Sequence, residues 1–305
     1  DYTGGGCPHI LAEPQRTNLM PYSEDFSQWG TKQGTETLNY GISPDGTQNS
    51  TRIIFSGSGQ EFKNNVTTSS NTSGSIYIKG VNGETIKFGL TSSESVFTLN
   101  GSWQRIEKQG TQTSNSITIN TYGGSTARDI QVWGAQLENG SYATSYIPTS
   151  GSTVTRNQDQ FTRDGIGSLI NSTEGVLFVE MAALSNDLTY RIISLSDGTD
   201  NERIYIQYTD TTNQVSVVVK VGGSTQANIQ HTLTDETVFS KMAFKWKAND
   251  FAFWIDGVEV GTDTSGSVPS GLNRLALDRQ LNTNTFFGKV KQLQVYKTAL
   301  TDAQL

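Results

Sequence analysis

The 305-residue sequence has little charge, one cysteine and two histidines, and each shortage excludes a class of protein. Charged residues make up only 17% of the chain, and the net charge is −7. Nucleic acids and anionic membrane surfaces attract basic patches, so this balance argues against both as partners. The single cysteine, Cys7, excludes a disulfide framework within the chain. No apolar run approaches the roughly 18 residues of a membrane-spanning helix, so no membrane insertion is expected.

Strong helix formers are also scarce, whereas Gly numbers 31 and Ser, Thr and Asn are abundant. The 13 Phe, 11 Tyr and five Trp nevertheless offer enough apolar surface for packed cores, because burial contributes roughly 25 cal/mol per Å². A chain of this length predicts two domains.

Short segments with β-branched or aromatic residues at alternate positions recur about every ten residues in both halves of the chain. The clearest segment places Phe251 and Phe253 on one face of a strand and Trp254 on the other. Asp256-Gly257 then follows as a two-residue hairpin turn. This spacing predicts an all-β fold of two β-sandwich (jelly-roll) domains in tandem.

The stretch from Trp133 to Asn157 determines where the chain divides. It begins as the last strand of the first domain, continues past the apolar anchors Tyr146 and Ile147, and becomes a Ser/Thr/Gly-rich connector at Thr149. The predicted organisation is an N-terminal connector over residues 1–17, a first sandwich over 18–148, a linker over 149–172 and a second sandwich over 173–305.

No pattern in the sequence predicts catalysis, so we expect no catalytic and no cofactor-binding residues. A glycoside hydrolase on such a sandwich needs two carboxylates at strand spacing, whereas Glu180 stands alone, and Asp256 and Glu259 flank the hairpin turn. His231 is interpreted as an ordinary strand histidine. The sequence therefore predicts that the protein is not an enzyme.

Cys7 lies two residues before His9, and a loop or packing role is favoured over a thiolate–imidazole pair. One cysteine and two histidines support zinc poorly.

Sugar binding on such folds uses exposed aromatic rings, but most aromatic residues of a two-sandwich chain belong to the cores. Trp246 and Trp254 lie in regular strands, and we predict that both are core residues. Tyr205 and Tyr208 fall on opposite faces of their strand, which predicts that one of them is exposed.

Three segments of the second half carry a family resemblance: "SDGTDNERIYIQY", "FWIDGVEVG" and "GKVKQLQVYKTALTDAQL". Because of these three segments, residues 175–305 resemble the concanavalin A-like, laminin-G-type jelly roll. The first half resembles the jelly roll of carbohydrate-binding modules. It matches their opening at Asn18-Leu19, Asp25-Phe26 and Trp29, and their closing strand at 129–138.

Such modules often hold one structural calcium ion between their first and last strands, so this resemblance implies a calcium site at Asp25 and Asp129. The loop with Asp197, Asp200 and Glu202 also offers the oxygen ligands that calcium prefers, but a solvated β-turn is favoured there.

Together, "EPQRTNLMPYSEDFSQW" and "GAQLENGSYATSYIPTSGSTVTRN" resemble the tail-fibre and head-fibre chains of tailed-phage virions. The resemblance implies a non-enzymatic structural and adhesion protein that is assembled into the virion in the bacterial host cytoplasm. Its implied partners are host-surface glycans, other virion proteins and further copies of itself, with a trimer favoured. The alternative is a secreted or cell-surface pair of glycan-binding accessory modules from a bacterial carbohydrate-active protein.

Overall fold

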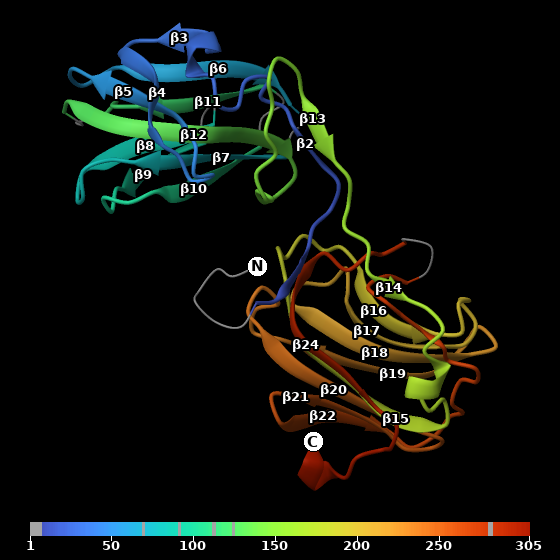
Figure 1. Ribbon diagram of the computed structural model, residues 1–305. Coiled ribbons are helices and arrows are strands. Elements are labelled where there is room, and N and C mark those ends of the chain that lie inside the picture. Colours follow the sequence, from blue (N-terminus) through green and yellow to red (C-terminus); the bar gives the residue numbers. More distant parts are fainter. Residues whose placement is uncertain (1–7, 69–70, 91–92, 112–113, 124–125, 280–282) are drawn as a thin grey trace. The chain divides into compact units, whose positions relative to one another are not determined.

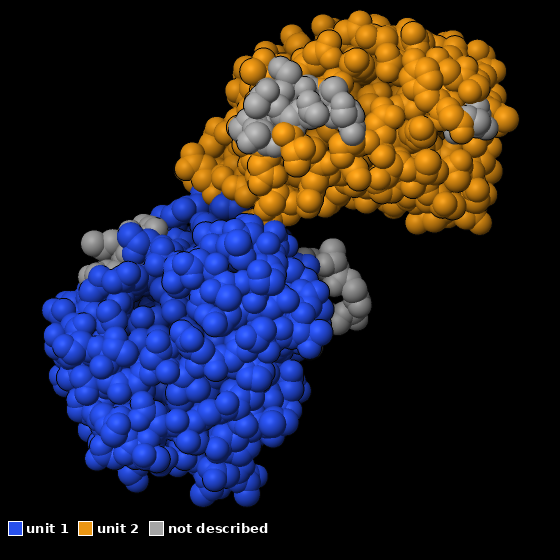
Figure 2. Space-filling model, turned by 180° about the vertical axis from the view of Figure 1, so that it is seen from behind, with its two compact units in different colours: residues 1–14, 158–305 blue, residues 15–157 orange. Residues whose placement is uncertain are grey.

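The computed structural model describes residues 8–68, 71–90, 93–111, 114–123, 126–279 and 283–305. The chain forms two compact units (Figure 2), which we call the N-terminal sandwich (Gln15–Asn157) and the C-terminal sandwich (Asp1–Pro14 with Gln158–Leu305). Antiparallel strands build both units (Figure 1), so the predicted all-β fold of two β-sandwiches is confirmed. In the described ranges no helix is long and apolar enough to cross a membrane.

The N-terminal sandwich contains two five-stranded sheets, and its core consists of residues such as Phe55, Phe88 and Ile119 that lie between them. The first sheet has the strand order β10 (Gln104–Gly110), β7 (Thr72–Lys79), β12 (Arg128–Asn139), β5 (Gln48–Phe55) and β4 (Thr35–Ile42). The second has the order β3 (Thr31–Lys32), β6 (Glu61–Thr67), β11 (Ser114–Asn120), β8 (Thr85–Leu90) and β9 (Ser93–Thr98). A 3-10 helix, η1, spans Phe26–Gln28.

The C-terminal sandwich contains two six-stranded sheets. Sheet 1 has the order β1 (Ile10–Ala12), β24 (Gly288–Tyr296), β15 (Glu174–Ala183), β20 (Ser240–Lys247), β21 (Phe251–Ile255) and β22 (Val258–Asp263). Sheet 2 has the order β14 (Thr162–Arg163), β23 (Arg274–Ala276), β16 (Arg191–Ser196), β17 (Arg203–Tyr208), β18 (Gln214–Val221) and β19 (Ser224–Thr232). The 3-10 helices η2 (Gly167–Leu169) and η3 (Asp302–Gln304) lie outside the sheets.

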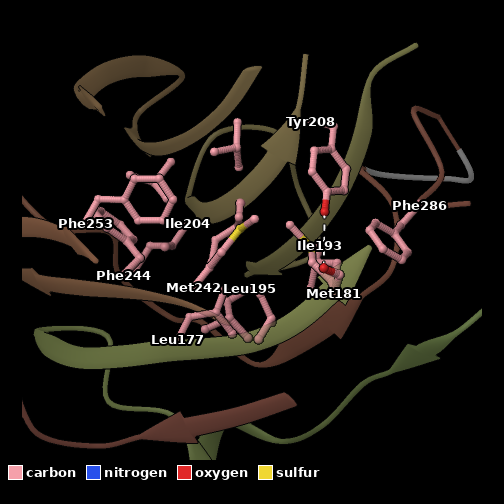
Figure 3. Close-up of a cluster of buried hydrophobic side chains, with 14 of the residues drawn as sticks. Leu177, Met181, Ile193, Leu195, Ile204, Tyr208, Met242, Phe244, Phe253 and Phe286 are labelled. Carbon is pink, nitrogen blue, oxygen red and sulfur yellow. Dashed lines mark hydrogen bonds between the residues drawn. The ribbon is translucent and has the colours of Figure 1, made fainter. Parts of the chain in front are cut away.

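Alternate residues of the two six-stranded sheets meet in one apolar core. Figure 3 shows residues of both sheets in this core, among them Leu177 and Phe244 from sheet 1 and Leu195, Ile204 and Tyr208 from sheet 2. The Tyr208 hydroxyl donates a hydrogen bond to the carbonyl of Met181 at 3.4 Å. We call the face of each sheet that points away from this core its outer face.

The hairpin predicted from Asp256-Gly257 connects β21 to β22. Both residues have positive φ, at 49° and 81°, as a two-residue hairpin turn of this kind requires.

The N-terminal segment differs from the connector predicted over residues 1–17. Strand β1 pairs with β24, with Ile10 opposite Val290 and Ala12 opposite Gly288. Ala12 is fully buried within the apolar core of the C-terminal sandwich. A strand of three residues carries too little alternation to be recognised in a sequence, and it covers the backbone of β24, which would otherwise end the sheet.

The predicted linker over residues 149–172 also differs in part. The Thr149 hydroxyl donates to the carbonyl of Met20 at 2.6 Å, and β13 (Val154–Arg156) pairs with β2 (Arg16–Asn18). Residues 149–157 therefore belong to the N-terminal sandwich, and the chain divides between Asn157 and Gln158. Hydrogen bonds from hydroxyls and from the backbone hold this segment in place. Such bonds leave no apolar pattern in the sequence, so the small polar residues resemble those of a free connector.

The position of β1 leads to a prediction about stability. Replacing Ala12→Asp puts an unpaired carboxylate into the core and should destabilise the C-terminal sandwich by about 3 kcal/mol. Ile10→Asp is the matched control, because Ile10 is 41% exposed on the same strand. Calorimetry of the whole chain should show a lower melting temperature for the C-terminal sandwich with Ala12→Asp alone. Equal effects of the two substitutions would mean that β1 is not docked.

Candidate functional site

The outer face of sheet 1 carries an aromatic row across three neighbouring strands. Phe178 of β15 lies opposite Ala243 of β20, and Ala243 lies opposite Trp254 of β21. Because the Ala243 side chain is small, the surface is lower between the two aromatic side chains. The adjacent strand β24 contributes Gln294, which pairs with Phe178.

A hollow of about 380 Å³ lies over this row, and we call it the aromatic hollow. Its lining consists of Phe178, Lys241, Ala243, Trp254, Asp256, Gly257 and Leu305. The indole Nε1–H of Trp254 is buried and has no hydrogen-bond partner among the described residues. The hollow thus combines two partly exposed rings and two oppositely charged side chains, Lys241 and Asp256.

The prediction that Trp246 is a core residue is confirmed, but the same prediction for Trp254 is wrong. Trp246 is fully buried in the core, whereas Trp254 is partly exposed and lines the aromatic hollow. The sequence contained the signal for this difference, because Trp254 alternates with the core residues Phe253 and Ile255. Phe178 was not identified from the sequence, although it stands between Leu177 and Val179 of the core.

The prediction that Tyr205 or Tyr208 is exposed is also wrong. Tyr208 is fully buried, and Tyr205 on the outer face of sheet 2 is only 7% exposed. Tyr205 clusters with Ile192 and Val218 from the neighbouring strands, and the guanidinium of Arg203 lies 5.0 Å from its ring centroid. Cross-strand neighbours therefore cover a ring that alternation alone would leave in solvent.

The N-terminal sandwich has a smaller hollow of about 240 Å³ on the sheet that contains β12, lined by Tyr40, Lys79, Gly80, Val81, Asp129, Ile130 and Gln131. The ring of Tyr40 is 44% exposed, and the guanidinium of Arg52 lies 4.9 Å from its centroid. Arg52 also donates to both oxygens of Asp129, at 2.8 and 2.5 Å. This contact lowers the pKa of Asp129 and raises that of Arg52.

In the structure, Asp25 and Asp129 each make hydrogen bonds to other protein groups. The Asp25 carboxylate caps η1, accepting hydrogen bonds from the amide and the hydroxyl of Ser27. Both oxygens of Asp129 bind Arg52, whose positive charge repels a cation. Within the described ranges no group of three or more His, Cys, Asp and Glu side chains could hold a metal ion. Protein groups thus engage both carboxylates, and the calcium site at Asp25 and Asp129 stays a prediction.

The acidic loop after β16 has protein partners for each of its carboxylates. Asp197 accepts from the amide and hydroxyl of Thr199, and Glu202 accepts from the amides of Gly222 and Ser270. Asp200 pairs with Arg203 of β17 and with Arg279, which follows β23.

Two of the three carboxylates weighed for catalysis are tied to a cation or to the backbone, and the third, Glu259, is exposed. Glu180 lies 3.4 Å from the Lys291 ammonium, and Asp256 accepts from the amide of Lys241 at 2.8 Å. His231 is half-buried on β19, and Cys7 lies outside the described residues. His9 packs edge-on against Phe239, with ring centroids 5.6 Å apart, which agrees with a packing role.

Glu236 is a buried carboxyl that the sequence did not single out. Burial raises its pKa to about 7, against the opposing effect of the Arg191 guanidinium, which lies 3.8 Å away. Glu236 is 1% exposed and lines neither hollow. It therefore belongs to the interior of the C-terminal sandwich, away from any surface that a substrate reaches.

Comparison with known proteins agrees with the fold of the C-terminal sandwich. Residues 177–305 match the family model described as the concanavalin A-like lectin/glucanases superfamily. No curated protein matches the sequence.

Several solved structures are similar to parts of the chain. The CBM40 domain of a Ruminococcus gnavus IT-sialidase shares 15% identity, covering 48% of this chain and 96% of its own, with a TM-score of 0.39. A SAP-like pentraxin from Limulus polyphemus also shares 15% identity over 45% of this chain and 69% of its own, with a TM-score of 0.36. Domains LG4-5 of mouse laminin alpha1 share 12% identity over 88% of this chain and 91% of their own, with a TM-score of 0.34. The superfamily match and the two packed six-stranded sheets together identify residues 177–305 as a sandwich similar to the concanavalin A-like lectins and glucanases.

Proposed function

We propose that the chain binds glycans without transforming them, and that the aromatic hollow is its binding site. The observation that carries this proposal is the row of Phe178, Ala243 and Trp254 on the outer face of sheet 1. The C–H faces of a pyranose ring pack against aromatic rings, while its hydroxyls need hydrogen-bond partners. Ala243 leaves space for one sugar ring between the two aromatic side chains, and Lys241 and Asp256 beside it can bond to sugar hydroxyls.

Binding without hydrolysis is supported by the acidic groups of the hollow. Glycoside hydrolysis needs a pair of carboxyl groups flanking the scissile bond. Among the side chains that line the hollow, only that of Asp256 is a carboxylate, and it accepts a hydrogen bond from the backbone amide of Lys241 on β20. The superfamily that matches residues 177–305 includes lectins and glucanases by description, and this arrangement favours the lectin type of function.

We further propose that the chain is part of a phage virion appendage that adheres to host-surface glycans. This proposal rests on the resemblance of residues 13–29 and 134–157 to tail-fibre and head-fibre chains. These two segments lie side by side through the pairing of β2 with β13 and through the hydrogen bond from Thr149 to Met20. Fibre chains of this kind assemble with other virion proteins and with copies of themselves, so we propose a homotrimer.

The glycan-binding proposal predicts the effect of removing each ring. A glycan array should identify a ligand, and calorimetry on that ligand should show at least about tenfold weaker binding for Trp254→Ala and for Phe178→Ala. Tyr296→Ala is the matched control, because Tyr296 is 39% exposed on the same sheet and does not line the hollow. Wild-type affinity in both ring variants would place the binding site elsewhere.

The virion proposal predicts the mass of the protein in solution. Multi-angle light scattering on the purified chain should give three times the mass of one chain. A monomer at micromolar concentration would refute the trimer and favour the accessory-module alternative.

A further inference from the structure

Sheet 2 carries a row of cations across its outer face, which we call the cationic row. Arg274 of β23 lies opposite Ser196 of β16, Ser196 lies opposite Arg203 of β17, and Arg203 lies opposite Lys220 of β18. Arg203 alternates with Ile204 of the core, so its side chain belongs to the outer face. Like charges directly opposite each other on neighbouring strands destabilise a sheet, and Arg203 and Lys220 are such a pair.

Arg279, which follows β23, adds a fourth cation to this surface. Its guanidinium lies 3.4 Å from one oxygen of Asp200, and the other oxygen of Asp200 pairs with Arg203. The pKa of Lys220 is lowered, mainly by burial. The positive charges of Arg203 and Arg279 lower it further.

The ion pairs on this surface leave one of the four cations out. Asp200 pairs with both Arg203 and Arg279, and Asp164 lies 3.5 Å from Arg274. Glu202 keeps its negative charge, but its oxygens accept hydrogen bonds from the backbone amides of Gly222 and Ser270. Among the described residues, Lys220 has no carboxylate within ion-pair distance.

Arg203 is the most deeply buried member of the row, and one of its N–H groups has no acceptor although Asp200 pairs with another. The residue is 1% exposed, and its Nε–H has no hydrogen-bond acceptor among the described residues. The Nε–H of Arg279 is also buried and also has no acceptor among the described residues, although the Arg279 side chain as a whole is 38% exposed. Burial lowers the pKa of Arg203, as expected for a guanidinium that water reaches poorly. Unpaired buried donors on cations are costly, and an acceptor from solution would relieve that cost.

We propose that the cationic row is a binding site for an oxyanion, a carboxylate or sulfate group, carried by an acidic glycan. Lys220 and Arg279 reach the anion from the surface, and Arg203 stabilises it from below. The guanidinium fork suits planar carboxylates and tetrahedral oxyanions, because it offers parallel N–H donors. The assignment of the anion to a glycan rests on the proposed function, whereas the anion site itself does not. The site lies on sheet 2, and the aromatic hollow lies on sheet 1.

The first test uses inorganic sulfate as the probe on the whole chain. At constant ionic strength, replacing chloride with sulfate should raise the melting temperature of the C-terminal sandwich more in the wild type than in the double variant Lys220→Gln/Arg279→Gln. Both replaced side chains are partly exposed, so the variant retains its core. Lys297→Gln is the matched control, because it removes an exposed cation elsewhere. An equal rise in the double variant would overturn the anion site, because sulfate also stabilises proteins nonspecifically.

The second test identifies the source of the anion with three ligands that share one core: 3′-sialyllactose, 3′-sulfolactose and lactose. At least one charged ligand should bind about tenfold more tightly than lactose, and the double variant should lose this preference. Lys297→Gln and Trp254→Ala should keep it. Equal affinity for all three, or no binding, would overturn the assignment to a glycan. Loss of binding in Trp254→Ala for lactose and the charged ligands alike would instead place every glycan in the aromatic hollow, and would overturn the second site.

Discussion

The alternation of side chains across the two six-stranded sheets is the constraint on which the account depends. Each strand sends every second residue into the shared core, so the register between neighbouring strands fixes which outward residues meet. In sheet 1 the registers of β15, β20 and β21 align Phe178, Ala243 and Trp254. In sheet 2 the registers of β16, β17 and β18 align Ser196, Arg203 and Lys220. A slip of one residue in either sheet would bury these side chains and expose the core.

Much of this fold follows from the sequence. The strand periods, the turn at Asp256-Gly257 and the burial of Trp246 were predictable because each depends on a few neighbouring residues. Thr301 precedes η3 and forms a capping box with Gln304, whose side chain accepts from the Thr301 amide at 3.0 Å. Local patterns of this kind are determined by alternation, turn chemistry and caps, which a sequence displays directly.

The sequence could not predict features that depend on pairing between distant strands. Strand β1 consists of three residues, and only its partner β24 makes it recognisable. The row of Phe178, Ala243 and Trp254 brings together positions up to 76 apart through two registers that no local pattern encodes. The same is true of Asp129, whose carboxylate was expected to bind calcium and instead binds Arg52 on the neighbouring strand β5. Candidate site residues could therefore be listed from the sequence, but their partners could not.

The central claim is that a glycan occupies the hollow beside Trp254, and indole resonances test it most directly. The chain has five tryptophans, so a two-dimensional ¹H–¹⁵N spectrum should contain five indole signals that single substitutions assign. Titration with the best ligand from a glycan array is predicted to move the signal of Trp254, because its ring lines the hollow and a bound sugar changes the magnetic environment of the indole. The signal of the buried Trp246 should stay in place. Ligand binding that leaves the Trp254 signal unmoved would contradict the account.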